Sequence, residues 1–233
     1  MKISYDLHIH SKLSPCSSEL MTPNNILNMC MLKGLNLVSV TDHNSSKQQE
    51  VIGKISTSYD YIYIYGIELS INEGYHILAY FESLDKIINF DNFIDNFLNK
   101  EKTKKLQEQI IYNIYDEEVD YIEYDLHQNI IIDLNELTNE IRKKNGIIIL
   151  AHIDRQKSGI FNFDVDLMNL DFDGFEVDNI NNLETIYQKY PFLKKYKILK
   201  NSDSHDLEMI NEDQFIEIKN LSFEGLKAWF RDE

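Results

Sequence analysis

The stretch "YDLHIHSKLSPC", residues 5–16, combines a strand-like pattern with three ionisable side chains. Side chains alternate between the two faces of an extended strand, so Asp6, His8 and His10 are expected on one face. Two imidazoles at this spacing lie about 6–7 Å apart, close enough to bind one metal ion together. Asp6 would then accept a hydrogen bond from the ring of a metal-binding histidine. The stretch therefore predicts a strand that ends in a metal site.

Apolar runs of strand length alternate with amphipathic stretches along the whole chain. Strands are expected at 3–9, 35–44, 59–70, 75–81, 147–154, 172–179, 196–205 and 215–220, and helices at 22–34, 134–146 and 222–230. Repeated strand–helix units favour parallel strands with helical crossovers. Polar residues follow nearly every strand, and a βα barrel builds its site at that end. The expected fold class is α/β, a distorted (β/α)7 TIM-like barrel formed by one domain over residues 1–233.

Two local features depart from this alternation. The turn "NEG" between 59–70 and 75–81 predicts a hairpin. Residues 84–128 mix a charged helical pattern, "NKEKTKKLQEQIIYNIY", with the acidic and aromatic run "DEEVDYIEYD". We expect this segment to be an insertion or a lid.

The composition narrows the class of protein. The 233 residues are 43% hydrophobic and carry a net charge of −16, from 39 acidic against 23 basic residues. An acidic surface repels a polyanion, so we expect small anionic ligands and no long nucleic acid. Two cysteines form no disulfide framework, and no apolar run approaches the roughly 18 residues of a membrane span. Together with an acidic residue at position 6, which does not fit a signal peptide, this favours a cytoplasmic protein. The sequence does not indicate an oligomeric state.

Six of the seven histidines lie at the ends of expected strands. They are His8, His10, His43, His76, His152 and His205. Any one of them alone fits an ordinary core or surface role. Six imidazoles converging on one place would be costly without a bound ion, because buried polar groups need partners. His127 lies in loop-like sequence and is expected at the surface.

Five motifs follow one another along the chain, each after an apolar run. They are "DLHIHS" (6–11), "TDHN" (41–44), "GIELS" (66–70), "AHIDR" (151–155) and "NSDSH" (201–205). In this order they resemble the PHP family of metal-dependent phosphoesterases, named for polymerase and histidinol phosphatase. The resemblance implies a distorted βα barrel of about seven strands and two or three divalent ions at the C-terminal ends of the strands.

The resemblance also implies the ligands of each ion. The first ion would be held by His8, His10, Glu68 and Asp203; the second by Glu68, His76 and His152; the third by His43 and His205. Many members have an aspartate where this chain has Pro15, and Glu19 is the candidate that replaces it. Cys16 is either a further thiolate ligand or, as is commoner for cysteine, an inert small side chain.

The implied reaction is hydrolysis of a phosphate monoester by a metal-activated water. Three divalent ions would outweigh the charges of Glu19, Glu68 and Asp203 and would attract a phosphate into an acidic protein. Mixed histidine and carboxylate ligands suit Mn, Fe or Zn better than Mg. Expected substrates are small phosphorylated metabolites or nucleotides, such as a nucleoside 3′,5′-bisphosphate or the 5′ ends of short RNA.

Asp42, Glu68 and Asp203 are the candidate catalytic residues. Asp42 would orient a ligand or accept a proton. Arg155 would either hold a substrate phosphate or pair with an acidic residue, and Asn44 is a candidate substrate contact.

Two other classes of protein fit parts of the same pattern. One is an amidohydrolase-type C–N hydrolase, which also begins with His-x-His on a barrel strand, although Glu68 here takes the place of a metal-bridging lysine. The other is a metal-binding regulatory domain without catalysis.

Overall fold

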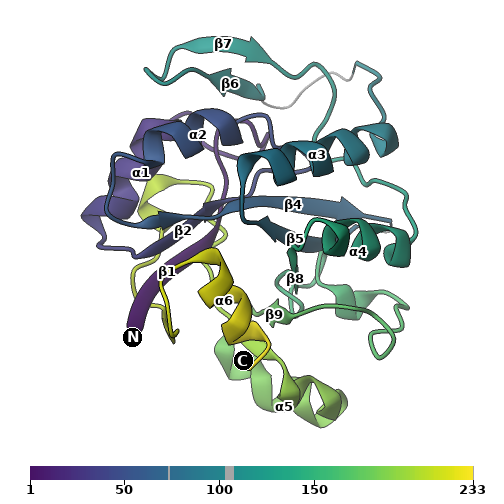
Figure 1. The fold of residues 1–233 in the computed structure, drawn as a ribbon. Coiled ribbons are helices and arrows are strands. Elements are labelled where there is room, and N and C mark those ends of the chain that lie inside the picture. Colours follow the sequence, from purple (N-terminus) through teal and green to yellow (C-terminus); the bar gives the residue numbers. More distant parts are fainter. Residues whose placement is uncertain (73, 103–107, 233) are drawn as a thin grey trace.

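The computed structural model describes residues 1–72, 74–102 and 108–232 (Figure 1). The strands are β1 (Lys2–Ile9), β2 (Leu37–Val40), β3 (Ile62–Tyr63), β4 (Tyr65–Ile71), β5 (Tyr75–Phe81), β6 (Ile110–Tyr112), β7 (Glu118–Tyr121), β8 (Ile147–Leu150), β9 (Gly174–Glu176), β10 (Lys197–Leu199) and β11 (Phe215–Glu217). The helices are α1 (Pro23–Leu32), α2 (Gln49–Ser56), α3 (Leu84–Ile94), α4 (Leu134–Lys143), α5 (Leu183–Lys189) and α6 (Phe223–Phe230). Short 3₁₀ turns lie at Asp95–Phe97, Ile160–Asn162, Ile180–Asn182, Pro191–Lys195 and Leu207–Met209.

The strands form two larger sheets and one hairpin. One sheet has the order β11–β1–β2–β3 and the other β10–β9–β8–β5–β4, while β6 pairs with β7. Isolated bridges between Ile9 and Ser204, and between His43 and Glu68, connect the two sheets at two places. The α/β class is therefore confirmed. The bridges place the end of β1 beside the segment after β10, and the residues after β2 beside Glu68 of β4.

Strand direction differs from the expected parallel pattern at two places. The hairpin of β4 and β5 is present as predicted, but β5 is also antiparallel to β8. β11 is antiparallel to β1. The alternation of strands and helices did not predict the antiparallel pairing of β5 with β8, because no helix separates β4 from β5.

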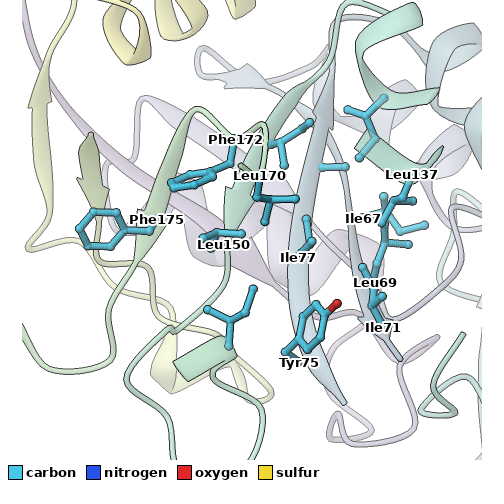
Figure 2. Close-up of a cluster of buried hydrophobic side chains, with 14 of the residues drawn as sticks. Ile67, Leu69, Ile71, Tyr75, Ile77, Leu137, Leu150, Leu170, Phe172 and Phe175 are labelled. Atoms are coloured by element: carbon cyan, nitrogen blue, oxygen red, sulfur yellow. The ribbon is translucent and has the colours of Figure 1, made fainter. Parts of the chain in front are cut away.

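The two faces of the central strands pack against different helices. Leu78 of β5 and Ile149 of β8 join β1 and α6 in one buried cluster. Their neighbours Ile77 and Leu150 face the opposite way, into a cluster that includes α3 and α4 (Figure 2). Burying one such aliphatic side chain contributes about 1.5–3 kcal/mol, so both faces hold the strands in place.

Helix ends agree with the sequence where a cap is encoded. Asp133 accepts hydrogen bonds from the backbone N–H groups of Asn135 and Glu136 at the start of α4. Ser222 caps α6 in the same way. α1 begins at Pro23, and Gly34 follows it with a φ of +66°, a conformation that favours glycine. The expected helix starts are confirmed, whereas α2, α3 and α5 are helices that the sequence did not predict.

The segment 84–128 contains a core helix and the β6–β7 hairpin. Helix α3 buries Ile87, Phe90 and Ile94 in the core beside β4 and β5. The expected helical pattern over 99–115 is wrong where the structure describes it, since residues 110–112 are a strand of the β6–β7 hairpin; residues 103–107, like residue 73 of the expected "NEG" turn, lie outside the described residues. Leu13, in the loop after β1, packs with Ile122 and Leu126, which follow the hairpin, and with Ile111 of β6.

A register shift in β1 changes the expected alternation. The shift falls between Asp6 and Ile9. Leu7 packs in the cluster with α6, whereas Ile9 packs with α1 and α2. These two residues therefore do not share a face, contrary to the simple strand pattern. An irregularity of this kind re-aims neighbouring side chains, here His8 and His10.

Of the helices in the described part of the chain, none is both long and apolar enough to cross a membrane.

Candidate metal centre

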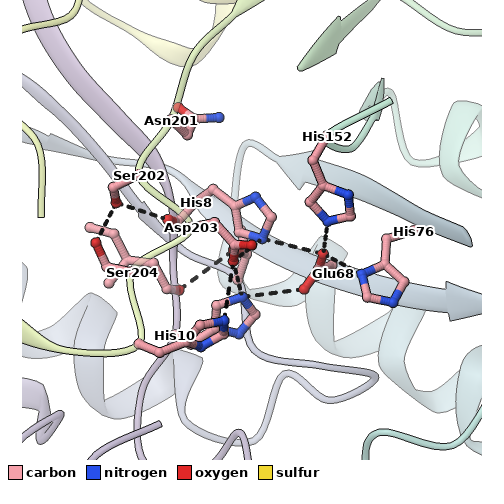
Figure 3. A network of polar contacts seen from close by, with 12 residues as sticks. His8, His10, Glu68, His76, His152, Asn201, Ser202, Asp203 and Ser204 are labelled. Atoms are coloured by element: carbon pink, nitrogen blue, oxygen red, sulfur yellow. Dashed lines mark hydrogen bonds and ion pairs between the residues drawn. The ribbon is translucent and has the colours of Figure 1, made fainter. Parts of the chain in front are cut away.

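Glu68 on β4 lies at the centre of a group of imidazoles (Figure 3). Oε1 of Glu68 lies 2.8 Å from Nδ1 of His76, 3.1 Å from Nε2 of His152 and 3.3 Å from Nε2 of His8; Oε2 lies 3.0 Å from Nδ1 of His43 and 3.2 Å from Nε2 of His10. Burial opposes ionisation, but His76 and the other imidazoles hold the pKa of Glu68 well below its usual range. The carboxylate is thus charged and shared by five rings.

Asp203 provides a second carboxylate, from the segment after β10. Its Oδ1 lies 3.2 Å from Nε2 of His8, 3.0 Å from Nε2 of His10 and 3.5 Å from Nε2 of His205. The φ of Asp203 is +51°, a conformation that aspartate tolerates better than most residues. Burial opposes ionisation here too, but His8 and His10 hold the pKa of Asp203 well below its usual range.

Four groups of side chains bring their ligand atoms within 4.8 Å of one another. They are His8, His10, Glu68 and Asp203; His43, Glu68 and His76; His10, Cys16 and His205; and Cys16, His43 and His127. The first group is the ligand set expected for the first ion. His152 also reaches Glu68. Cys16 belongs to the last two groups, in agreement with the first of its two expected roles, and His127, expected at the surface, belongs to the last group.

Several buried atoms at the centre lack an ordinary partner. Among the described residues, Nε2 of His8, Nδ1 of His43 and Oε2 of Glu68 have no neighbour in hydrogen-bonding geometry, although charged groups lie 3.0–3.3 Å away. Buried polar atoms are rarely left this way. Imidazole nitrogens and carboxylate oxygens that converge in this manner are suitable ligands for a divalent metal ion.

The histidines differ in charge according to their neighbours. Burial favours the neutral ring of His10, but Asp203 and Glu68 raise its pKa to about 9. Burial lowers the pKa of His43, and burial together with His10 lowers that of His205 to about 3. Neutral imidazole is the form that binds a metal, so an ion has to displace a proton from His10 but not from His205.

Glu176 is a functional candidate that the sequence analysis missed. Its Oε2 accepts a hydrogen bond from Nδ1 of His8 at 2.9 Å and one from the backbone N–H of His152 at 3.2 Å. This leaves Nε2 of His8 for an ion. Asp6, which was expected in this role, instead accepts from the backbone N–H groups of Ser202 and Asn211. Glu176 ends the apolar strand β9, the same signal that marked the strand-end histidines.

Asp42 acts on His10 through Ser14. The hydroxyl of Ser14 donates to Oδ1 of Asp42 at 2.7 Å and lies 3.0 Å from Nδ1 of His10. With its proton used this way, the hydroxyl accepts from Nδ1–H, which leaves Nε2 of His10 for an ion. Ser11 also donates to both carboxylate oxygens. This arrangement supports the orienting role considered for Asp42.

The expected substrate contacts are both engaged within the protein. Nε and Nη2 of Arg155 form a bidentate pair with Asp178, and Nη1 donates to Asp203. Asn44 donates to the carbonyls of Leu126 and Gln128. The amide of Asn44 thus holds the 126–128 loop rather than being directed at a substrate.

Glu19 is not brought into the cluster. Its carboxylate pairs with Nζ of Lys12 at 2.7 Å and is 76% exposed. His127 is exposed, as expected, and its ring also lies against that of His43, with the two ring centroids 4.4 Å apart.

Comparison with known proteins supports the fold. No protein-family model matches the chain, and a search of curated proteins gives no match. Two structures of endonuclease Q are similar, both at 19% identity. The lesion-specific enzyme from Pyrococcus furiosus has a TM-score of 0.74 over 98% of this chain, and a complex with a 27-mer duplex carrying an abasic lesion has 0.72 over 100%. The chain spans only 55% and 57% of their lengths.

Two bacterial structures are also similar. A protein described as a metal-dependent phosphoesterase, from Bifidobacterium adolescentis, has a TM-score of 0.62 at 16% identity and aligns over 97% of this chain and 95% of its own. A two-domain protein from Bacteroides vulgatus, described as containing a PHP-like metal-dependent phosphoesterase, has 0.57 at 14% identity, over 99% of this chain and 62% of its own. The chain therefore has the fold of the PHP-like metal-dependent phosphoesterases.

Proposed function

We propose that this protein is a metal-dependent phosphoesterase that hydrolyses phosphate monoesters of small metabolites or nucleotides. The observation that carries the proposal is the Glu68 carboxylate, shared by five imidazoles and buried with unsatisfied atoms around it. Packing alone does not explain such a centre, because burying charged groups is unfavourable unless they are paired or bind a metal ion. The fold supports the same class of enzyme.

Two or three divalent ions, Mn, Fe or Zn rather than Mg, would supply an activated water and neutralise the phosphoryl oxygens. The chain would hold them with the residues expected from the sequence, except Glu19. Glu176 and Asp42 would fix the rings of His8 and His10 through hydrogen bonds. Arg155 uses three of the five N–H donors of a guanidinium and would offer the others to a phosphate oxygen.

Charge favours a small substrate. The chain carries −16 overall, whereas the ions would leave a local positive charge at the centre. A long duplex would meet the acidic surface before reaching the site. The endonuclease Q in the duplex complex is a longer protein, of which this chain spans only 57%.

We also propose that residues 1–233 form a single domain whose strands make a distorted barrel. In ring order, β1, β2, β4, β5, β8, β9 and β10 are neighbours through strand pairs or through the two isolated bridges. The metal centre lies where those bridges form.

The test is hydrolysis by metal-stripped protein after loading with Mn²⁺, Fe²⁺ or Zn²⁺. Substrates would be para-nitrophenyl phosphate, a nucleoside 3′,5′-bisphosphate, a 5′-phosphorylated RNA oligomer, an abasic duplex and a panel of amides. We expect metal-dependent release of phosphate that is lost in Asp203→Asn and kept in Asp213→Asn, an exposed control.

Three results would oppose the proposal. Cleavage of amides alone would indicate a C–N hydrolase, and incision of the duplex alone would indicate an endonuclease. Metal binding without any hydrolysis would indicate a regulatory domain.

A further inference from the structure

We propose that Cys16 and His127 complete the third metal site together with His43 and His205. The site would then have a sulfur ligand and would select Zn²⁺, Co²⁺ or Fe²⁺ over Mn²⁺ and Mg²⁺, because thiolates favour softer ions. This inference rests on the metal centre of the proposed function and specifies the ligands and ion preference of one part of it.

Cys16 lies where two groups of histidines meet. Its Sγ is 3.3 Å from Nδ1 of His205. A tetrahedral ion with bonds of about 2.3 Å to sulfur and 2.0–2.1 Å to nitrogen separates those two atoms by about 3.5 Å. Cys16 is also within reach of His43 and His127, since the ligand atoms of these three residues lie within 4.8 Å of one another. Cys16 therefore belongs to two groups, one with His10 and His205 and one with His43 and His127. An ion beside Cys16 would have to bring His205 together with His43 and His127.

The backbone holds Cys16 at this place. The loop after β1 makes two tight turns, in which Ser14 N–H donates to the Ser11 carbonyl and Ser17 N–H donates to the Ser14 carbonyl. Ser18 N–H then donates to the carbonyl of His205 at 2.9 Å. This bond ties the loop to the segment that carries His205, so the contact between Cys16 and His205 is part of the fold.

His127 is fixed from both sides. Asn44 donates to the carbonyl of Leu126 at 2.9 Å and to that of Gln128 at 2.8 Å. Leu126 is buried, and its N–H donates to the side chain of Gln109. The ring of His127 meets that of His43 edge to face. The segment after β7 therefore carries an anchored imidazole to the metal centre.

Cys16 would also provide the negatively charged ligand of this site. Glu19 is held outside by Lys12, and Nδ1 of His43 is already close to Glu68. The imidazoles of His43, His127 and His205 bind an ion as neutral rings, so they bring no negative charge to the site. A thiolate supplies one, because a metal ion removes the thiol proton on binding.

The experiment is titration of the metal-stripped protein with Co²⁺, followed by absorption spectroscopy. A Co²⁺ ion bound to thiolate gives a charge-transfer band in the near ultraviolet, which histidine and carboxylate ligands do not. We expect this band in the wild type and in Cys30→Ser, a matched control at the only other cysteine of the sequence, which lies on α1 and is buried in the core. Cys16→Ser should lose the band.

Affinity gives a second measurement. In equilibrium dialysis with elemental analysis, the affinity of Cys16→Ser for one ion should fall by more than ~100-fold. Loss of a group that only orients a ligand lowers metal affinity by about 10- to 100-fold, and loss of the ligand itself should lower it further. His127→Gln should weaken the same ion while keeping the thiolate band. In the wild type, Zn²⁺ should protect Cys16 from alkylation, as read by peptide mass mapping, which does not depend on a variant folding.

The outcomes separate this inference from the proposed function. Full Co²⁺ uptake without a thiolate band, or Cys16 alkylated equally fast with and without Zn²⁺, would overturn the ligand assignment and leave the phosphoesterase proposal standing. A protein that binds no Co²⁺ or Zn²⁺ would refute both.

Discussion

Replacing Glu176 by glutamine tests whether a residue that touches no substrate sets metal affinity. Glu176 accepts from Nδ1 of His8 at 2.9 Å, and both side chains are buried. Glutamine keeps the size of the side chain and removes its charge. Partners of this kind change metal affinity by about 10- to 100-fold, which is about 1.4–2.7 kcal/mol. A hydrogen bond to a charged group is worth about 1.5–3 kcal/mol, in agreement with that range.

The effect should depend on pH. Burial opposes protonation of His8, but Asp203 and Glu176 raise its pKa well above the usual value. At neutral pH the ion must displace that proton, and Glu176→Gln makes the proton easier to remove. The loss of affinity should therefore be smaller near pH 7 than near pH 9, because the proton competes less as the pH rises.

The assay is competition for Zn²⁺ against a chromogenic chelator at both pH values, with thermal melting to confirm folding. Glu217→Gln is the control, because Glu217 is exposed on the edge strand β11. Equal affinity of Glu176→Gln and wild type at both pH values would refute the reasoning, as would the same loss in the control.

Further predictions concern the ligands and their supports. His8→Ala and Asp203→Ala should each abolish turnover in a steady-state assay while circular dichroism stays native, because each removes a donor from the central cluster; an active double variant would contradict the assignment. Arg155→Ala should raise KM with little change in kcat if the guanidinium binds substrate before reaction, and unchanged kinetics would leave only its pairing with acidic residues. Burial lowers the pKa of His10, but Asp203 and Glu68 raise it to about 9. The apparent metal affinity, measured by chelator competition, should therefore increase from about pH 6 to pH 9 as this proton is lost. A flat pH profile would be inconsistent with a displaced proton. Asn44→Ala should lower the free energy of unfolding by about 1–3 kcal/mol in a denaturant melt, because two carbonyls lose their donor, and an unchanged midpoint would argue against the clamp.

The central donors could be predicted because their signals are local. His8 lies near the end of the apolar strand β1 and His10 follows that strand, so their spacing was enough to propose a shared ion. Glu68 was added by the resemblance of the motifs to the PHP family. The β4–β5 hairpin was predictable for the same reason, since a short turn between two apolar runs leaves few alternatives.

The supporting residues could not be found in this way. Asp6 precedes His8 by two residues, yet a register shift in β1 separates their side chains and Glu176 of β9 takes the expected role. The sequence offered both Glu19 and Cys16 after the first motif, and the turns of one loop decide which of them faces the cluster.

By itself, the sequence determined the α/β class and the donors that lie at strand ends, because strand periodicity acts over a few residues. Tertiary structure alone decided that His127 reaches His43, through a loop that Asn44 holds from more than 80 positions away. Contacts over such separations depend on how the strands and loops pack together, which no local pattern encodes.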